Sequence, residues 1–297
     1  MAGTAVRLGP AAHAVPRAVP RAVRRRRMLV AVADHSILIA LSIGFLAPIV
    51  FITLTAFMTN DQALSTNLWP HPFRPQNFID VFRIEPVWRY TLNTFLYAGL
   101  ATLGLLLSSI PVAYALAVLR WRGRGVAFVL VLVTMMLPQQ VTIVPLYVLF
   151  SKLHLIGTIW PLIIPNWFGD AFSIFLLRQF FLTIPTEYAD AARVDGCREL
   201  RILTSVYCRL AKPAIAAVAL FSFLYCWNDF FAPLLYTGEN PAHWTLSIGL
   251  SQFRTVHQVQ WNLTMAATLL FMAPVIALFF AAQKAFVEGV TLTAVKG

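Results

Sequence analysis

Six long runs of apolar residues, separated by polar segments, dominate the hydrophobic pattern of this 297-residue chain. The runs cover residues 36–58, 91–119, 126–150, 159–182, 213–235 and 263–286. Each is long enough for an α-helix to cross a bilayer, which takes roughly 20 apolar residues. Backbone amides in lipid must be hydrogen-bonded within the segment, and the alternation typical of barrel strands is absent from the sequence. The pattern therefore predicts an all-α, polytopic membrane bundle of six transmembrane helices.

The composition is that of a membrane protein. Hydrophobic residues make up 59% of the chain and charged residues 12%, against roughly 45–50% and 25% in soluble domains. The three cysteines show no CxxC spacing and the six histidines no H-E-x-x-H pattern. We therefore expect no disulfide framework, no metal site and no zinc-dependent protease activity.

The basic residues divide unevenly between the two sides of the membrane that six spans define. Eighteen of the 23 lysines and arginines lie in the N-terminal tail, in residues 120–125, in residues 178–212 and in the C-terminal tail. Basic residues concentrate in cytoplasmic loops. The sequence therefore predicts a multi-pass protein of the cell membrane with both termini in the cytoplasm.

The Arg-rich N-terminal tail resembles the start of a signal peptide. The apolar run that follows is too long for a signal peptide, however, and no A-x-A site comes after it, which favours an uncleaved first span. The tail also lacks the aromatic interleaving and the modules of nucleic-acid-binding proteins. We expect it to contact anionic membrane lipids, with no nucleic-acid partner.

These features predict the organisation of the chain. It comprises a basic cytoplasmic tail at 1–35, a first transmembrane helix at 36–58, an external loop at 59–90, a transmembrane core at 91–286 that includes a cytoplasmic segment at 183–212, and a cytoplasmic C-terminal tail at 287–297. The external loop is polar and rich in proline, so we expect it to form an ordered cap on the outer side, which either contacts a solute-binding protein or is a passive loop.

The cytoplasmic segment 183–212 exceeds an ordinary helix connection, which takes roughly 2–8 residues. Thr186 is a plausible N-cap, and Glu187 and Asp190 follow in the first turn, where negative charge is favourable for the helix dipole. Gly196 is the expected end because glycine readily adopts a positive φ. We therefore predict a helix of about nine residues, a bend and a second helix.

The two predicted helices present different surfaces. The second carries an apolar face opposite three arginines, which is typical of a helix lying along a membrane. That face consists of Ile202, Leu203, Val206, Tyr207 and Leu210. The first carries Ala189, Ala191 and Ala192, small residues that allow a partner to approach closely. It either docks into a groove or forms a solvated amphipathic surface.

The stretch DAARVDGCRELRILTSVYCRLAKP, which begins at Asp190, resembles the E-A-A signature of binding-protein-dependent ABC importer permeases. In that signature an acidic-Ala-Ala triplet is followed by three residues, Gly, nine residues and I-x-L-P. The positions in register are Asp190, Ala191, Ala192 and Gly196, with Val206 in place of the isoleucine. Cys208 and Arg209 replace the leucine and the proline, so the end of the motif is degenerate.

Further fragments are similar to the carbohydrate branch of this family, the maltose-type permeases. They are AYALAVLRWRGRG from Ala113, LPQQVTIVPLYVLFSKLHLIGT from Leu137, FLLRQFF from Phe175, WNDFFAPLLY from Trp227 and the terminal AVKG. The resemblance covers nearly the whole chain from Ser36 onward. It implies the fold of a type I ABC importer transmembrane domain that forms one half of a heterodimeric channel.

The resemblance also implies how such a protein works. The permease is not an enzyme and binds no cofactor, because a partner subunit binds and hydrolyses ATP; the chain accordingly has no G-x-x-x-x-G-K-[ST] loop. The implied partners are a second homologous permease subunit, a dimer of ATP-binding subunits and an extracytoplasmic solute-binding protein. The residues implied to form the coupling helix are Glu187, Asp190, Ala191, Ala192, Asp195 and Gly196. Lys296, in the C-terminal tail, is a further candidate contact with the ATPase, the alternative being a frayed end.

Three polar residues lie at membrane depth. Asp170 either faces a wet cavity or a partner, or lies near the outer interface because Pro161 and Pro165 interrupt the run and the helix begins near Trp167. Asn228 and Asp229, beside Trp227, Phe230 and Phe231, are candidates for hydrogen bonds to sugar hydroxyls in a translocation path. An interfacial aromatic belt explains the same aromatic residues without a substrate.

Two other classes of function remain as alternatives. A stand-alone secondary transporter or channel typically carries ionisable pairs within its spans and internal repeats. A membrane enzyme requires a metal or nucleophile constellation, which the sequence does not show. Sugars, sugar alcohols and glycerol phosphates are all carried by relatives of this branch, so the solute stays open.

Overall fold

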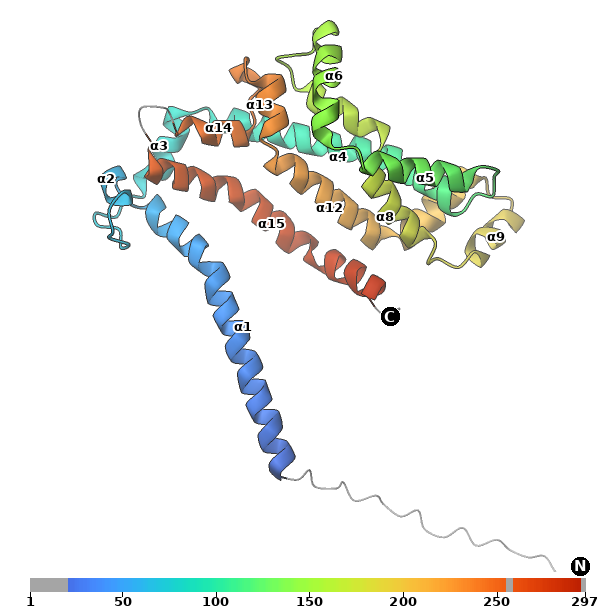
Figure 1. Cartoon of the computed structure of the whole chain (residues 1–297), viewed down its shortest axis with the longest axis horizontal. Helices are drawn as coiled ribbons and strands as arrows, with labels where there is room; N and C mark the ends of the chain where they lie inside the picture. The colour runs from blue at the N-terminus through green and yellow to red at the C-terminus, as the bar shows by residue number, and fades with distance from the viewer. Residues whose placement is uncertain (1–20, 255–258, 295–297) are drawn as a thin grey trace, which may run out of the picture. The chain divides into compact units, whose positions relative to one another are not determined.

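The computed structural model describes residues 21–254 and 259–294 of the chain, and the regular elements within them are helical (Figure 1). The chain divides into two compact units, Met1–Phe51 and Ile52–Gly297. Four helices are long and apolar enough to cross a membrane, and there are six spans if each of two bent helix pairs counts as one. The all-α fold with six candidate spans agrees with the prediction.

The first unit is dominated by helix α1 (Arg21–Ala56), whose apolar part, Val32–Ala56, is a candidate span. The side chains from residue 32 to residue 50 are exposed on every face of the helix. A helix that is hydrophobic all round is suited to lipid. The helix covers most of the predicted first span, 36–58, and begins well before residue 36.

The core of the second unit consists of four packed helices. They are α4 (Val87–Ala117), α8 (Ala171–Phe181), α12 (Lys212–Asn228) and α15 (Trp261–Ala294). Helix α4 packs against both α8 and α12, and α12 packs in turn against α15 (Figure 1). Gly104 on α4 lies so close to the indole of Trp167 that no Cβ would fit there. Small residues of this kind allow transmembrane helices to approach closely.

The C-terminal end of α4 has carbonyl groups that the helix cannot satisfy by itself. Arg124 donates to the carbonyls of Ala117 and Leu119, and Arg178 donates to that of Leu116 at 3.2 Å. Two arginines therefore cap this helix with charge-assisted bonds, and their charges suit the negative end of the helix dipole.

The third predicted span is not one straight helix. Residues 126–150 fall in α5 (Arg124–Met135) and α6 (Gln139–Lys152), whose axes differ by 92°. Pro138 lies at the break. Proline cannot donate a backbone hydrogen bond and disfavours helical geometry in the residue before it. A continuous helix over 126–150 was therefore the wrong expectation.

The fourth predicted span is also interrupted. It contains α7 (Trp160–Ile163) and a 3₁₀ helix η1 (Ile164–Phe168), followed by Gly169 with a φ of +89°. Helix α8 begins after this glycine. Pro161 and Pro165 lie at the starts of α7 and η1, and the interruption comes later, at Gly169, so the new helix begins at Ala171 rather than near Trp167.

Short helices precede and follow α12. The segment before it comprises α9 (Glu187–Val194), α10 (Glu199–Ile202), a π-helical turn η2 (Leu203–Tyr207) and α11 (Cys208–Leu210). The chain then bends by 82° into α12. Beyond Asp229 it continues in α13 (Phe231–Thr237), so the fifth predicted span, 213–235, is divided at Asp229.

The remaining elements form ordered loops. They are α2 (Asn60–Ala63), α3 (Gln76–Ile84), the 3₁₀ helix η3 (Pro241–His243) and α14 (Leu246–Gln252). The fully buried Asn77 of α3 donates to the carbonyls of Ala56 and Met58, at 2.8 Å each, and accepts from Asn262 of α15. The region 59–90 is therefore ordered.

Replacing Asn77 by alanine should lower the stability of the fold by about 2 kcal/mol, because two buried carbonyls lose their donor. Thermal unfolding of the detergent-solubilised protein measures the effect. Asn67→Ala, at an exposed position of the same loop region, is the matched control and should unfold at the wild-type temperature. Equal unfolding temperatures for the two variants would contradict this role of Asn77.

Candidate functional site

Helix α9 forms where the sequence predicts it. It runs from Glu187 to Val194, with Glu187 and Asp190 in its first turn. The hydroxyl of Thr186 makes no capping hydrogen bond, so the predicted side-chain cap is wrong. The carbonyl of Thr186 accepts instead from the N–H of Asp190 at 3.0 Å. The acidic first turn supplies the favourable interaction with the helix dipole.

Gly196 ends α9 as predicted. Its φ is +77°, and its N–H donates to the carbonyl of Arg193 while the N–H of Cys197 donates to that of Ala192. This pair of bonds is the Schellman arrangement, which requires the left-handed conformation that glycine adopts without strain. A Cβ at Gly196 would meet nothing within 4 Å. The requirement for glycine is therefore one of backbone conformation, not of space.

The alanines of α9 do not all face outward. Ala189 is fully buried, Ala192 packs partly buried against the core, and Ala191 alone of the three is exposed. The outward surface instead carries Tyr188 and Val194, which is 88% exposed. The expected surface of three small residues is therefore corrected. Two of them anchor the helix to its own chain, while larger apolar side chains stand free beside the acidic ones.

A charged network ties α9 to the neighbouring helices. Arg193 pairs with Asp190 at 2.8 Å and, across the bend, with Glu199 at 2.8 Å. The hydroxyl of Tyr114, on α4, donates to the other oxygen of Glu199 at 2.6 Å. The carboxylate of Glu199 thus joins the end of α9 to the end of a transmembrane helix.

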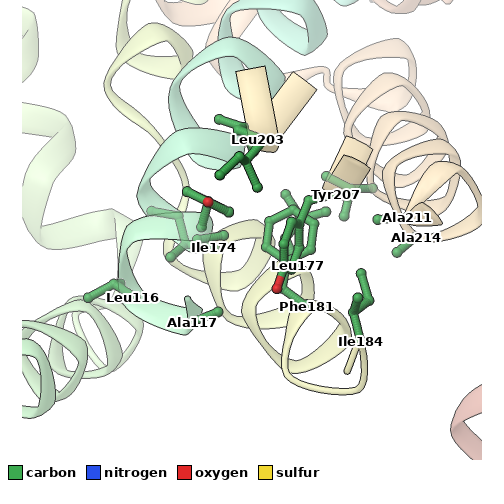
Figure 2. Packing of buried hydrophobic residues seen from close by; sticks show 14 of the residues in the cluster. Leu116, Ala117, Ile174, Leu177, Phe181, Ile184, Leu203, Tyr207, Ala211 and Ala214 are labelled. Atoms are coloured by element: carbon green, nitrogen blue, oxygen red, sulfur yellow. The ribbon is translucent and has the colours of Figure 1, made fainter. Parts of the chain in front are cut away.

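Buried aromatic rings support this network. Tyr114 meets Tyr207 edge to face at a centroid distance of 5.1 Å, and Tyr207 meets Phe181 in the same manner at 5.6 Å. Figure 2 shows Phe181 and Tyr207 close together in the cluster, with residues of α8, η2 and α12 around them. Edge-to-face contacts of this kind add to the stabilisation from burial. The base of α9 therefore rests on a close-packed core.

The predicted apolar face of the second helix is partly correct. Ile202, Leu203 and Tyr207 are buried, but Leu210 is 44% exposed and Ala211 is buried in its place. The π-helical turn over 203–207 explains the difference, because it adds one residue to the turn and moves later residues around the axis.

A cavity of about 560 Å³ lies among the broken spans. Its walls come from α4, α6, α7 and η1, α8, α12 and α13. Asp170 and Asp229, which are far apart in sequence, both line it. The structure thus brings together two of the three polar residues that the sequence singled out at membrane depth.

Each of these carboxylates receives hydrogen bonds from the start of a helix or from its neighbours. Asp170 caps α8, accepting from the N–H and the hydroxyl of Ser173 at 2.8 and 2.7 Å. Asp229 accepts from the N–H of Ala232 at 3.2 Å and from the hydroxyl of Tyr97 at 2.9 Å. Asp170 is half-buried on the cavity wall.

Asn228 and the aromatic residues beside it are placed differently. Asn228 and Phe230 line a second cavity, of about 570 Å³, and the Asn228 amide donates to the carbonyl of Leu224. Trp227 is buried and its indole donates to the carbonyl of Phe271 on α15. Trp227 therefore joins two helices, and it also lines the second cavity. Phe231 alone of the three predicted aromatic residues lines the first cavity.

Several residues of these sites carry no signal in the sequence. Tyr97, Tyr114 and Glu199 lie on segments far from their partners, and their roles emerge when α4 packs against α8 and α12. A glutamate after a bend and tyrosines within an apolar run are common in membrane proteins. Lys296 and the tail at 1–20 lie outside the described residues.

The chain is similar to known membrane proteins. Residues 109–292 match the family described as "Binding-protein-dependent transport system inner membrane component". The arabinooligosaccharides transport system permease protein AraQ of Halalkalibacterium halodurans is 32% identical over 263 residues, which cover 86% of this chain and 93% of that protein. The sn-glycerol-3-phosphate transport system permease protein UgpE of Escherichia coli O1:K1 / APEC is 33% identical over 206 residues, covering 69% and 73% respectively.

Two solved structures share the fold. A chain of a bacterial ABC transporter involved in the import of the acidic polysaccharide alginate aligns with a TM-score of 0.78 at 24% identity, over 88% of this chain and 98% of its own. In the alginate transporter in complex with an alginate pentasaccharide-bound periplasmic protein, a chain aligns with a TM-score of 0.64 at 16% identity, over 88% and 94%. The predicted family resemblance and fold are confirmed.

The stabilising effect of Glu199 should depend on pH. Hydrogen bonds from Arg193 and Tyr114 lower the pKa of Glu199 from its ordinary value of 4.5. Such a group stabilises the fold above its unfolded pKa and loses this effect as the pH falls through the folded value. At pH 7 the wild-type protein should unfold at a higher temperature than Glu199→Gln. This difference in unfolding temperature should shrink as the pH falls below about 4.5 and vanish once the pH is below the folded pKa of Glu199.

Glu239→Gln is the matched control, because it neutralises an exposed glutamate elsewhere. A wild-type advantage over Glu199→Gln that stays constant across the acid range would contradict the role of the ionised carboxylate.

Proposed function

The chain belongs to the binding-protein-dependent transport system inner membrane components, and from this membership we propose that it forms half of a translocation path driven by a separate ATPase. It is a multi-pass permease of an ABC importer. In the proposed arrangement both termini and α9 face the cytoplasm, and α9 docks into a groove of the ATPase subunit. The residues proposed for this contact are Glu187, Asp190, Ala191, Ala192, Asp195 and Gly196. Ala192 is partly buried against the core, so it supports this contact by holding α9 to its own chain.

The observation that carries the proposal is the way α9 is held. Its end is fixed by Gly196 and by the contacts of Arg193 with Glu199, and Glu199 is bonded to Tyr114 of a transmembrane helix. A short helix held at its base moves as a rigid body with the helices that hold it. A displacement imposed on α9 would therefore reach α4 directly.

The outward surface of α9 suits a protein partner. Tyr188 is 54% exposed and Val194 88% exposed, beside the exposed acidic side chains of Glu187 and Asp190. Apolar side chains with a charged rim are typical of a protein interface. The acidic residues favour a partner groove that carries basic or hydrogen-bond-donating groups.

The further partners follow from the family and its relatives. We propose a second, homologous permease subunit, a dimer of ATP-binding subunits and an extracytoplasmic solute-binding protein. The alginate transporter that shares this fold was solved in complex with a periplasmic protein, which supports the last of these. ATP is bound by the partner subunit, and no cofactor is assigned to this chain.

The proposed solute is a sugar or a related polyol or glycerophosphate. This range reflects the relatives, of which one is named for arabinooligosaccharides and another for sn-glycerol-3-phosphate. Uptake of a solute panel by the reconstituted importer distinguishes these classes.

Two substitutions in α9 should abolish solute-stimulated ATP hydrolysis while leaving membrane insertion intact. Asp190→Arg reverses a charge on the exposed surface and repels a groove that complements it, so stimulation should fall at least about tenfold. Gly196→Pro fixes φ near −65°, which is incompatible with the observed +77° and removes the bond to Arg193. Stimulated ATPase activity of the complete complex in proteoliposomes is the measurement.

Asp61→Arg is the matched control, because it makes the same exchange at an exposed position of α2. It should retain stimulation. Normal stimulation in Asp190→Arg and Gly196→Pro would contradict the docking role of α9.

A further inference from the structure

The first cavity is lined by two carboxyl groups, with no basic side chain among the described residues of its wall. Asp170 and Asp229 both line it, and no lysine, arginine or histidine occurs among the described residues of its wall. Every hydrogen bond described above for these two carboxylates comes from an N–H or O–H donor. Ionised carboxylates accept bonds in this way. The cavity is therefore expected to hold a negative potential.

The broken helices add to this expectation. Where a membrane helix is interrupted, the N-terminus of the following half-helix is a common binding point for anionic groups of a substrate. Here Asp170 accepts from the N–H of Ser173 at the start of α8, and Asp229 accepts from the N–H of Ala232 in α13. The chain's own carboxylates thus occupy backbone donors that an anionic solute would require.

The remaining wall suits polyhydroxy solutes. It presents hydroxyl and amide groups together with aromatic rings, among them Asn166, Ser222, Tyr225, Phe231 and Tyr236. Sugar rings stack on aromatic faces and exchange hydrogen bonds with such groups. A volume of about 560 Å³ lies within the range of small-molecule sites.

We propose that this cavity lies on the solute path and selects by charge, admitting neutral and cationic sugars and rejecting anionic solutes such as sugar phosphates, glycerol phosphates and uronates. The path itself rests on the proposed function, whereas the charge of the cavity does not. Among the relatives, the inference places this chain with the permease named for arabinooligosaccharides, which are neutral. It separates the chain from the relative named for sn-glycerol-3-phosphate and from the alginate importer.

The charge of the cavity can be measured without knowing the solute. Ala232→Cys, made after Cys197, Cys208 and Cys226 are replaced by alanine, puts a thiol on the cavity wall. Two methanethiosulfonate reagents of similar size are applied to the purified complex, one with a trimethylammonium group and one with a sulfonate. The ratio of their reaction rates reports the local potential, and the same ratio at Asn67→Cys, an exposed loop position, is the reference.

The cationic-to-anionic rate ratio at position 232 should exceed the reference ratio at least about tenfold. Adding Asp170→Asn and Asp229→Asn should bring it to within about threefold of the reference. The comparison of position 232 with position 67 retains both aspartates. It therefore tests the charge of the cavity even if the Asp170→Asn and Asp229→Asn variants fail to fold. A ratio at 232 equal to or below the reference would overturn the proposal.

Selectivity of transport is the second readout. In proteoliposomes that hold the whole importer, we expect ATP-dependent uptake of a neutral arabinooligosaccharide or an amino sugar. Uptake of sn-glycerol-3-phosphate or of an alginate oligosaccharide would overturn the proposal. If uptake proceeds without ATP, the proposed function fails instead, and the reagent ratio still decides whether the cavity is negative.

Discussion

Within lipid, the backbone N–H and C=O groups of a chain must find hydrogen-bond partners in the protein itself. In this structure that constraint matters most where the spans are interrupted. The fourth span is broken before α8, and the Asp170 carboxylate accepts a hydrogen bond from the N–H of Ser173 in the first turn of the new helix. The fifth is broken at Asp229, which receives an N–H of α13. At the end of α4, Arg124 and Arg178 donate to the free carbonyls. Charged side chains thus complete the backbone hydrogen bonding at each of these points.

Side-chain hydrogen bonds also hold α9 to the rest of the chain. Glu199 accepts hydrogen bonds from Arg193 and from Tyr114, and Tyr114 meets Tyr207 edge to face within the core. The hydrogen bond between Tyr114 and Glu199, with the aromatic ring of Tyr207 beside it, holds the segment of α9 to the transmembrane helix α4. Since α9 retains an exposed, partly apolar outer surface, it is held on one side and available on the other. That combination is what a lever between two subunits requires.

The sequence predicted some features well and missed others for physical reasons. The six apolar runs and the stop at Gly196 were predictable, because span length and positive φ are local properties. The bend at Pro138 and the break at Asp229 were not expected, because each lies within a run that is long and apolar enough to be read as one span. The burial of Ala189 and Trp227 was missed, since it depends on which neighbouring helix each one faces. The convergence of Asp170 with Asp229 and of Tyr114 with Glu199 arises from packing between segments far apart in the chain.

We propose that another subunit binds α9 from the cytoplasmic side. The most direct test is photo-cross-linking from Val194, the most exposed apolar side chain of that helix, after its replacement by a benzophenone-bearing residue in the assembled importer. We expect a cross-link between residue 194 and the ATPase subunit, and we expect the yield of this cross-link to change when ATP is added. A cross-link to the solute-binding protein, or to lipid alone in a complex that contains the ATPase, would contradict it.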